Sequence, residues 1–250
     1  MSYNPFSLEN KTILITGASS GIGKATAIEC SKLGAKCIIT ARNEERLSQT
    51  FTKLEGEGHT KLIADLSSDD NIEKIVENCP QIDGLVNNAG ISRPLPVNFV
   101  TREKIDQIFP TNLEGPILLF SRLLKTKKLG KGSSSVFTSS INGVWGGGKA
   151  ECLYSASKAA LSGFVKSAAL DLAPKGIRVN CVCPGMVETG ILSDGAITPE
   201  QLAENAKGYP VGRHGKPEEV AWAIIYLLSD AAGFVTGSNL VIDGGISIKI

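Results

Sequence analysis

The chain has 250 residues, of which 42% are hydrophobic and 20% are charged, and its formal net charge is +1. This composition excludes a disordered or collagen-like chain, and the near-neutral charge gives no general attraction to nucleic acid or to an anionic membrane surface. No apolar stretch reaches the length of a membrane span, and residues 1–10 lack the basic start and apolar run of a signal peptide.

Short apolar runs alternate with longer amphipathic stretches, which is the pattern of strand–helix–strand units around a buried parallel sheet. Each interval between strands holds roughly one helix, as right-handed crossovers require. The sequence therefore predicts an α/β fold with a doubly wound, seven-stranded parallel sheet and helices on both faces, forming one Rossmann-like domain over residues 1–250. We expect strands at 12–16, 36–40, 61–64, 84–87, 134–138, 178–182 and 240–242, and helices at 24–33, 44–54, 71–78, 154–172 and 217–228.

A glycine-rich turn, Thr16 to Gly23 (T-G-A-S-S-G-I-G), separates the first expected strand from the first expected helix. Its glycines let the backbone approach a pyrophosphate, whose charge is met by free amides at the helix N-terminus. The spacing differs from the commoner G-x-G-x-x-G, and such a sequence can be merely a turn. Its position between strand and helix favours dinucleotide binding.

The second expected strand ends before Ala41 and Arg42, where the adenosine ribose of a dinucleotide would lie. A carboxylate there would bind both ribose hydroxyls and repel a 2′-phosphate, whereas a guanidinium suits bidentate contact with that phosphate. The alternative is that Arg42 simply begins an exposed helix. We expect NADP(H) to be preferred over NAD(H).

Two regions interrupt the regular pattern. Residues 187–212 are rich in glycine and proline, have weak periodicity and are long for a connection, so we expect a substrate lid there. The basic run 125–131 follows the apolar residues 117–120, and we expect its cations to complement the C-terminus of a helix that ends at Gly130. A partner-binding patch is the alternative interpretation of this run.

Tyr154 and Lys158 are four residues apart in an expected helix and therefore share one face. A free tyrosine has a pKa near ~10 and is a poor base at neutral pH. A cation at about 4 Å supplies about 4 kcal/mol at an effective dielectric of 20, which is enough to lower that pKa by two or three units. Chance can produce such a pair, but its place after a serine-bearing strand end and downstream of the glycine turn indicates an acid/base pair.

Several further motifs follow the glycine turn in a fixed order along nearly the full chain. Together with that turn they are Thr16–Gly23, Asp65, Asn87-Asn88-Ala89-Gly90, Asn112, Ser139-Ser140, Tyr154 with Lys158, Pro184-Gly185 with Thr189, Val235-Thr236-Gly237 and Asp243-Gly244-Gly245. In this order they resemble the short-chain dehydrogenase/reductase family, most of all its 3-oxoacyl-carrier-protein-reductase-like branch. That resemblance implies hydride transfer between nicotinamide and a carbonyl or secondary alcohol carbon.

The resemblance implies four catalytic residues. Tyr154 would exchange a proton with the substrate oxygen, and Lys158 would lower the pKa of that tyrosine and bind the nicotinamide ribose. Ser140 would polarise the substrate oxygen, and Asn112 would hold a water on the path to Lys158. The residues expected to bind the cofactor are Gly17, Ser19, Ser20, Gly21, Ile22, Gly23, Arg42, Asp65, Leu66, Asn88, Ala89, Gly90, Tyr154, Lys158, Pro184, Gly185, Val187 and Thr189.

Some positions keep an alternative explanation. Asp65, expected to meet the adenine amino group, could instead cap the next helix, and Asn87 and Asn88 could be ordinary turn residues. Pro110 and Pro116 flank Asn112 and imply a helix boundary or kink there, and Asn112 could simply satisfy that break.

The serine and the phosphate-binding turn depart from the family pattern. Only one of Ser139 and Ser140 can face the substrate, because adjacent strand residues point to opposite sides, and we choose Ser140. The interval to Tyr154 is one residue longer than usual, and a bulge at 146–148 could absorb it. Ser20 stands where many NADP-preferring relatives carry a basic residue, which leaves Arg42 nearly alone in selecting the phosphate.

Two other functions stay open, namely an NAD-dependent dehydrogenase of an alcohol, sugar or steroid and a non-catalytic cofactor-sensing protein. We expect no metal site, because His59 and His214 lie in polar loops and the spacing of the six cysteines is not that of zinc ligands. The cysteines are expected to be reduced and mostly buried in a cytoplasmic protein.

The expected partners are a small carbonyl or alcohol substrate and, by resemblance, further copies of this chain in a tetramer with helix 154–172 at an interface. We expect neither nucleic acid nor membrane as a partner. The loop after Gly90 and the lid would read the substrate. Residues that could line an apolar pocket there are Ile91, Leu95, Trp145, Met186 and Ile191.

Overall fold

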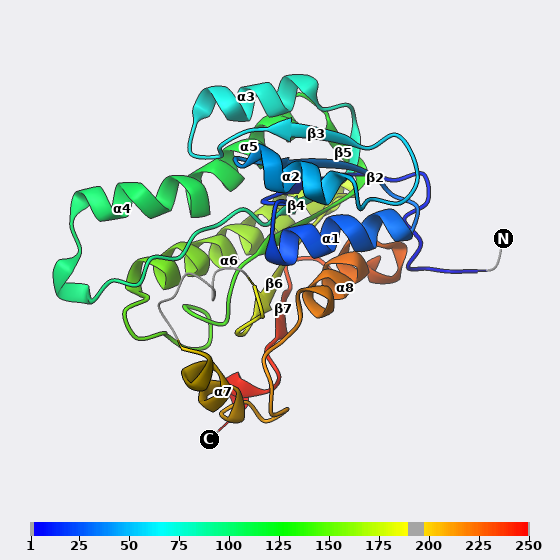
Figure 1. Cartoon of the computed structure of the whole chain (residues 1–250). Coiled ribbons are helices and arrows are strands. Elements are labelled where there is room, and N and C mark those ends of the chain that lie inside the picture. Colours follow the sequence, from blue (N-terminus) through cyan, green and yellow to red (C-terminus); the bar gives the residue numbers. More distant parts are fainter. Residues whose placement is uncertain (1–2, 190–197, 250) are drawn as a thin grey trace.

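A computed structural model describes residues 3–189 and 198–249. Its strands form one parallel sheet in the order β3-β2-β1-β4-β5-β6-β7, which confirms the predicted doubly wound topology (Figure 1). The order reverses between β1 and β4, and such folds bind ligands at the carboxyl ends of the strands at that point. The strands are β1 (Thr12–Thr16), β2 (Lys36–Ala41), β3 (Thr60–Ile63), β4 (Ile82–Asn87), β5 (Leu129–Thr138), β6 (Arg178–Pro184) and β7 (Asn239–Ile242).

Helices cover both faces of the sheet (Figure 1). One face carries α1 (Gly21–Lys32), α2 (Glu44–Phe51) and α8 (Pro217–Leu228). The other carries α3 (Asp69–Asn78), α5 (Gly115–Lys125) and α6 (Cys152–Leu172), with α4 (Arg102–Phe109) beside α6. A further helix, α7 (Pro199–Lys207), lies near the C-terminal end of the chain. Within the described ranges, no helix combines the length and the apolar character that a bilayer crossing needs.

Alternating strand residues build a separate core on each face. In β1, Leu14 packs with α3, α5 and α6, while Ile13 and Ile15 pack with α1 and α8. Because successive residues of β1 point to opposite faces and both faces are buried, its sequence is a continuous apolar run. Each fully buried side chain of this size contributes about 1.5–3 kcal/mol.

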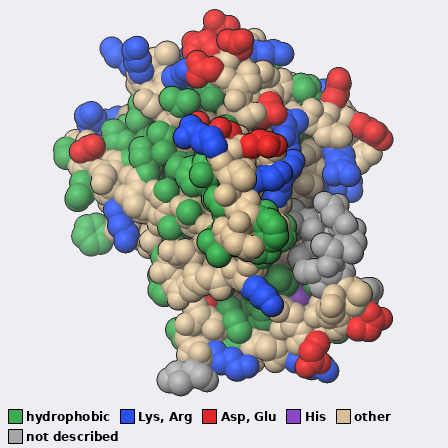
Figure 2. All heavy atoms as spheres, turned by 90° about the vertical axis from the view of Figure 1, so that its left-hand side faces the viewer, with side chains coloured by type: hydrophobic (Ala, Val, Ile, Leu, Met, Phe, Trp, Pro, Cys, Tyr) green, Lys and Arg blue, Asp and Glu red, His purple; other side chains and the backbone are tan. Residues whose placement is uncertain are grey.

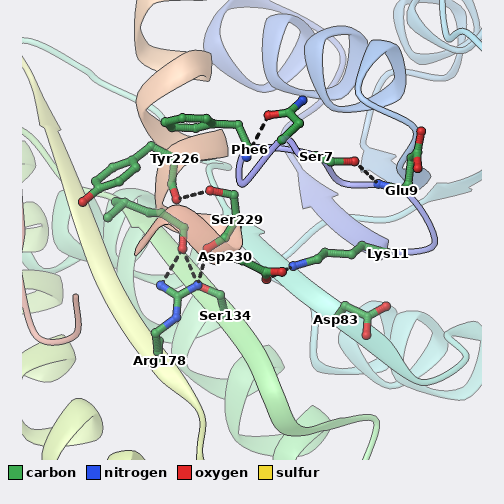
Figure 3. A network of polar contacts seen from close by, with 12 residues as sticks. Phe6, Ser7, Glu9, Lys11, Asp83, Ser134, Arg178, Tyr226, Ser229 and Asp230 are labelled. Atoms are coloured by element: carbon green, nitrogen blue, oxygen red, sulfur yellow. Dashed lines mark hydrogen bonds and ion pairs between the residues drawn. The ribbon is translucent and has the colours of Figure 1, made fainter. Parts of the chain in front are cut away.

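A polar network fixes the C-terminus of α8 to the amino ends of β5 and β6 (Figure 3). The Arg178 guanidinium donates to the carbonyl oxygens of Leu227 at 2.7 Å and Ser229 at 3.0 Å, and the Ser134 hydroxyl donates to Leu227 O at 2.8 Å. These bonds satisfy carbonyl groups that a helix end leaves without partners. The candidate site lies at the opposite edge of the sheet, where the strands have their carboxyl ends.

The sequence pattern did not predict α4 or α7. α7 begins at a capping box formed by Thr198 and Gln201, so residues 199–207 are helical and the expectation of an irregular segment over 187–212 is wrong there. Residues 190–197 of the predicted lid lie outside the described residues.

The predicted helix end at Gly130 is also wrong. α5 ends at Lys125, Lys127 adopts a positive φ of 58°, and β5 begins at Leu129. The helix closes there because the N–H groups of Lys127 and Lys128 donate to the carbonyl oxygens of Leu124 and Leu123. The Lys128 ammonium donates to the carbonyl oxygens of Val76 and Glu77. This cation therefore complements the C-terminus of α3 rather than that of its own preceding helix.

Candidate functional site

The glycine turn after β1 packs directly against the segment that follows β4. Gly17 has a φ of +66°, and a Cβ added to it would lie 2.8 Å from the Cα of Ala89. A Cβ on Gly23 would lie 2.3 Å from the carbonyl oxygen of Gly17. Only glycine fits these positions, because a side chain would push the turn away from both neighbours.

The N-terminus of α1 is open to an anion. Its N-cap, Ser20, makes no side-chain capping bond, and the first turn carries no acidic residue. The free backbone amides at this helix end, together with the positive end of the helix dipole, can therefore meet a negative charge beside the turn that contains Ser19 and Ile22. Thr189 lies over this turn, since a Cβ on Gly21 would meet its methyl group at 3.0 Å.

Side-chain bonds join the carboxyl ends of β1, β4 and β5. The Thr16 hydroxyl oxygen accepts the backbone N–H groups of Asn88 at 3.0 Å and Ala89 at 3.1 Å. The Asn88 amide donates to Thr16 O at 3.3 Å and accepts the Thr138 hydroxyl at 3.3 Å. Asn88 is thus a bridge between strands as well as a turn residue. The neighbouring Asn87 is buried, and neither of its amide atoms has a partner among the described residues.

Lys158 is buried beneath this edge. Its ammonium donates to the carbonyl oxygen of Thr138 at 2.7 Å and lies 5.8 Å from the centroid of the Tyr154 ring. A Cβ on Gly90 would lie 3.2 Å from this ammonium, so glycine leaves it space. Burial lowers the pKa of Lys158 to about 8.

Tyr154 is half-buried in the first turn of α6. Burial raises the pKa of its phenol, hydrogen bonding with the Ser140 side chain lowers it, and the charge of Glu151 raises it; the net shift is upward. The ammonium of Lys158 donates to the carbonyl oxygen of Thr138 and not to the phenol oxygen, so the predicted effect of Lys158 on this pKa stays a prediction.

The two candidate serines directly follow β5, and their hydroxyl groups have different partners. The Ser139 hydroxyl donates to Lys158 O at 2.8 Å and lies 2.9 Å from the Ser162 hydroxyl, so it is absorbed in packing against α6. The Ser140 side chain faces Tyr154 and accepts the N–H of Asn142 at 3.1 Å. The structure therefore brings Ser140, and not Ser139, to the phenol.

Asn112 lies in a π-helical turn, Pro110–Glu114, that joins α4 to α5. Its carbonyl oxygen accepts the N–H of Ile91 at 2.8 Å, and its amide donates to Ile91 O at 2.9 Å and to the Ser157 hydroxyl at 3.2 Å. The interruption expected from the prolines is present as this wider turn, which aims the fully buried Asn112 at α6. Asn112 thus fastens the loop after Gly90 to the helix that carries Tyr154.

Arg42 and Asp65 follow the neighbouring strands β2 and β3 and lie 3.5 Å apart, guanidinium nitrogen to carboxylate oxygen. Arg42 does not begin α2, because Asn43 is the N-cap of that helix. Asp65 does not cap α3, since Ser68 does so; it accepts the N–H and hydroxyl of Ser67 instead.

The segment after β6 is held from below by residues that sequence reasoning missed. The Tyr209 hydroxyl accepts the N–H of Met186 at 2.9 Å, and buried Val187 pairs with Gly215. His214, expected in a polar loop, is buried against the Tyr209 ring at 5.4 Å. Of the predicted residues in this segment, Thr189 lies against Gly21 of the glycine turn, while Gly185 lies against Asp243 and Tyr209.

The predicted apolar pocket is only partly formed. Ile91, Leu95 and Met186 are half-buried, but Trp145 is 47% exposed, and Ile191 lies outside the described residues. A carboxylate, Glu151, instead lies at the start of α6 and accepts the Ser92 hydroxyl at 2.9–3.0 Å. Sequence reasoning missed Glu151, although its place three residues before Tyr154 on a helix was a usable signal.

These residues fit a dinucleotide. The glycine turn offers a cradle that any Cβ would fill, the α1 N-terminus is uncapped by any side chain, and Asn87 has unpartnered buried amide atoms at the strand edge. Arg42 and Asp65 stand at the far end of the same edge, about where the adenosine of such a molecule would lie. Leu66, which is also expected to bind the cofactor, follows Asp65 and is buried.

Comparison with known proteins identifies the family. Residues 17–247 match the model of a family described as enoyl-(acyl carrier protein) reductase. A solved structure described as a short chain dehydrogenase/reductase family protein superposes with a TM-score of 0.85 at 33% identity, covering 97% of this chain and 100% of that one. The chain belongs to the short-chain dehydrogenase/reductase family.

Two further members of the short-chain dehydrogenase/reductase family bear on its chemistry. The 3-oxoacyl-(acyl-carrier-protein) reductase of Thermotoga maritima is 37% identical, over 96% of this chain and 99% of its own. A Beutenbergia cavernae structure, described as an NAD(P)-dependent gluconate 5-dehydrogenase with NADP bound at low occupancy, has a TM-score of 0.87 at 30% identity, covering 98% of this chain and 100% of that one. This short-chain dehydrogenase/reductase is an oxidoreductase of carbonyl or alcohol groups that uses a nicotinamide cofactor.

Proposed function

We propose that this protein is an NADP(H)-dependent reductase of carbonyl compounds, working reversibly on the corresponding secondary alcohols. The observation that carries the proposal is the meeting of Tyr154 and Ser140 at the strand edge that also holds the glycine turn. Lys158 and Asn112 support the same face from below. Reduction of a 3-oxoacyl thioester, the reaction named for the Thermotoga maritima relative, is one form of this activity.

The side chains have complementary tasks in such a reaction. The bound nicotinamide supplies or accepts the hydride. Ser140 donates a hydrogen bond to the substrate oxygen, and Tyr154 gives its phenol proton to that oxygen as negative charge develops there. A raised phenol pKa keeps Tyr154 protonated in the free enzyme, which suits the direction of reduction. Lys158 would bind the nicotinamide ribose, and Asn112 holds the loop after Gly90 against α6 through its bonds to Ile91 and Ser157.

Arg42 is the basis for preferring NADP(H). Its guanidinium is 58% exposed, so it can turn from Asp65 to a 2′-phosphate without leaving a buried charge behind. Asp65 would then face the adenine. NADP bound to the Beutenbergia cavernae structure supports the same choice, while an NAD-dependent dehydrogenase is the alternative.

The test is a panel of ketones, aldehydes, 3-oxoacyl thioesters and secondary alcohols with both cofactors. We expect turnover with a ratio of kcat/KM for NADPH over NADH above one; a ratio below one rejects the cofactor assignment. Crotonyl-coenzyme A belongs in the panel because the matching family model is described by enoyl reduction. Turnover of acetoacetyl-coenzyme A without crotonyl-coenzyme A supports carbonyl chemistry, and no turnover of any compound contradicts the proposal.

We infer that the protein assembles into a homo-oligomer, a tetramer by family likeness, through the face that carries α6. The outward side of α6 is a stripe of small residues ending in Leu170, which is 78% exposed. Figure 2 shows hydrophobic side chains gathered on one face of the molecule among charged ones. Small side chains let a second helix approach closely. An isolated monomer in light scattering would contradict this inference. The stripe consists of Ala156, Ala160, Gly163, Ser167 and Leu170.

We also infer that the protein works in the cytoplasm. All six cysteines are free, and burial raises the pKa of Cys37 to about 12 and that of Cys79 to about 11. Such thiols are inert packing groups rather than disulfide precursors, as expected in a reducing compartment.

A further inference from the structure

Glu151 is the N-cap of α6, the helix that carries Tyr154 and Lys158. Its carbonyl oxygen accepts the N–H of Ser155 at 2.8 Å, which begins the helix, so its side chain has a defined direction. Tyr154, three residues later, lies in the first turn of the helix that Glu151 caps, and Lys158 follows one turn further along. The charge of Glu151 acts on the Tyr154 phenol, which agrees with this placement. Glu151 is therefore a neighbour of the reacting centre.

The carboxylate of Glu151 has no cation beside it in the described part of the chain. It is half-buried, and its bonding partner is the neutral hydroxyl of Ser92, which can donate only one hydrogen bond. Burying a carboxylate without a counter-ion costs free energy, so a half-buried one beside an acid/base group is a functional candidate. Its remaining acceptor positions are available to a donor from outside the protein.

Other polar groups continue from Glu151 to the substrate oxygen position. A Cβ added to Gly148 would lie 2.9 Å from both the Glu151 Cγ and the Asn142 amide nitrogen, so Gly148 lies between these two side chains. Asn142 in turn donates its backbone N–H to the Ser140 hydroxyl at 3.1 Å. Ser92, Glu151, Asn142 and Ser140 therefore form a polar strip beside Tyr154.

Resting on the proposed carbonyl reduction, we infer that Glu151 is a specificity-determining residue that accepts a hydrogen bond from a hydroxyl group of the substrate. The substrates favoured by this site are carbonyl compounds that carry a hydroxyl on a neighbouring carbon. An amide such as Asn142 both donates and accepts, and a carboxylate accepts, which together match the donor and acceptor capacity of hydroxyl groups. An unsubstituted alkyl chain would desolvate Glu151 and give it no hydrogen bond in return.

The test compares hydroxyacetone with butanone, two ketones of nearly the same size that differ by a hydroxyl in place of a methyl group. We expect wild-type kcat/KM to be higher for hydroxyacetone. Glu151→Ala lowers kcat/KM for hydroxyacetone by about 10- to 100-fold, because a hydrogen bond to a charged group is lost, and changes that for butanone little. Glu151→Gln, which still accepts a hydrogen bond, retains part of the preference.

Glu77→Ala is the matched control, because it removes an exposed carboxylate on α3 and leaves the site intact. Its ratio of kcat/KM for hydroxyacetone over butanone should equal that of wild type. Equal losses for both ketones in Glu151→Ala would show a structural role and overturn the inference. A wild-type preference for butanone, or turnover of acetoacetyl-coenzyme A alone, overturns it as well while leaving carbonyl reduction standing. Absence of turnover across the whole panel refutes the proposed function itself.

Discussion

The Lys158 ammonium is bonded to the carbonyl oxygen of Thr138 at 2.7 Å, and it lies 5.8 Å from the centre of the Tyr154 ring. Burial lowers its pKa to about 8, so in the folded protein the charge is held at a cost. An unfolded lysine keeps its proton up to about pH 10. Between these values the unfolded chain binds more protons, and stability therefore rises with pH in that window.

Lys158→Met removes this buried charge and should raise stability while abolishing activity. The lowered pKa of Lys158 corresponds to about 3 kcal/mol of destabilisation by the buried charge, which the variant removes. The loss of the hydrogen bond to Thr138 offsets about 1–2 kcal/mol of that gain. We expect a higher thermal midpoint than wild type at pH 7, with the difference shrinking as the pH rises from 8 towards 10. Thermal unfolding followed by circular dichroism at several pH values measures this. A lower midpoint at pH 7 would show that the charge stabilises the fold.

Glu151→Gln should shift the pH dependence of alcohol oxidation to lower pH. Burial raises the pKa of Tyr154, the Ser140 bond lowers it, and Glu151 raises it further. Removing the negative charge takes away one of the two causes that raise it, so the phenolate forms at lower pH. The measurement is kcat/KM for a secondary alcohol across pH, in which the rising limb moves to the acid side; an unchanged profile would place Glu151 too far from the phenol to act on it.

Ser140→Ala and Ser139→Ala should separate catalysis from packing. Ser140 faces the phenol, so its loss should lower kcat by about 10²-fold with little effect on folding. Ser139 bonds to Lys158 O and Ser162 within the core, so its loss should lower the free energy of unfolding by about 1–3 kcal/mol. Its effect on kcat should be smaller than that of Ser140→Ala. Steady-state kinetics and thermal unfolding of both variants decide the matter. A larger fall in kcat for Ser139→Ala would reverse the assignment.

Arg42→Ala should weaken NADPH and spare NADH. The guanidinium is the candidate partner of the 2′-phosphate, and a lost charge-assisted bond corresponds to about 10- to 100-fold in KM. Cofactor titrations with both dinucleotides check this, and Arg46→Ala, at an exposed arginine of the same region, is the control. Equal weakening of the two cofactors would remove Arg42 from phosphate selection.

The sheet was predictable because central strands such as β1 and β2 are buried on both faces and therefore consist of short apolar runs. α4 was not, since it is short and leads into Pro110, which ordinarily ends a helix; here the π-helical turn at Asn112 carries the chain on. α7 carries a readable start signal, Thr198-Pro199 with Gln201, that the surrounding glycines obscure.

The candidate site was predictable as a set of residues but not in its electrostatics. Helical spacing correctly makes Tyr154 and Lys158 neighbours, yet it cannot show that a backbone carbonyl competes for the ammonium. The choice between Ser139 and Ser140 depends on the partners of each hydroxyl group, which the sequence does not show. The position of Glu151 three residues before Tyr154 is a local signal, but its contact with Ser92 is not. That contact, like the contact of Tyr209 with Met186, joins residues that are distant in the sequence.

The most direct test of the central claim is the kinetics of Tyr154→Phe with NADPH and a substrate taken from the panel. The variant keeps the ring in α6 and loses only the hydroxyl that would give its proton to the substrate oxygen. We predict unchanged binding of NADPH, measured by fluorescence titration, together with a fall in kcat of about 10²- to 10⁴-fold. Turnover near the wild-type rate with the cofactor still bound would contradict the account.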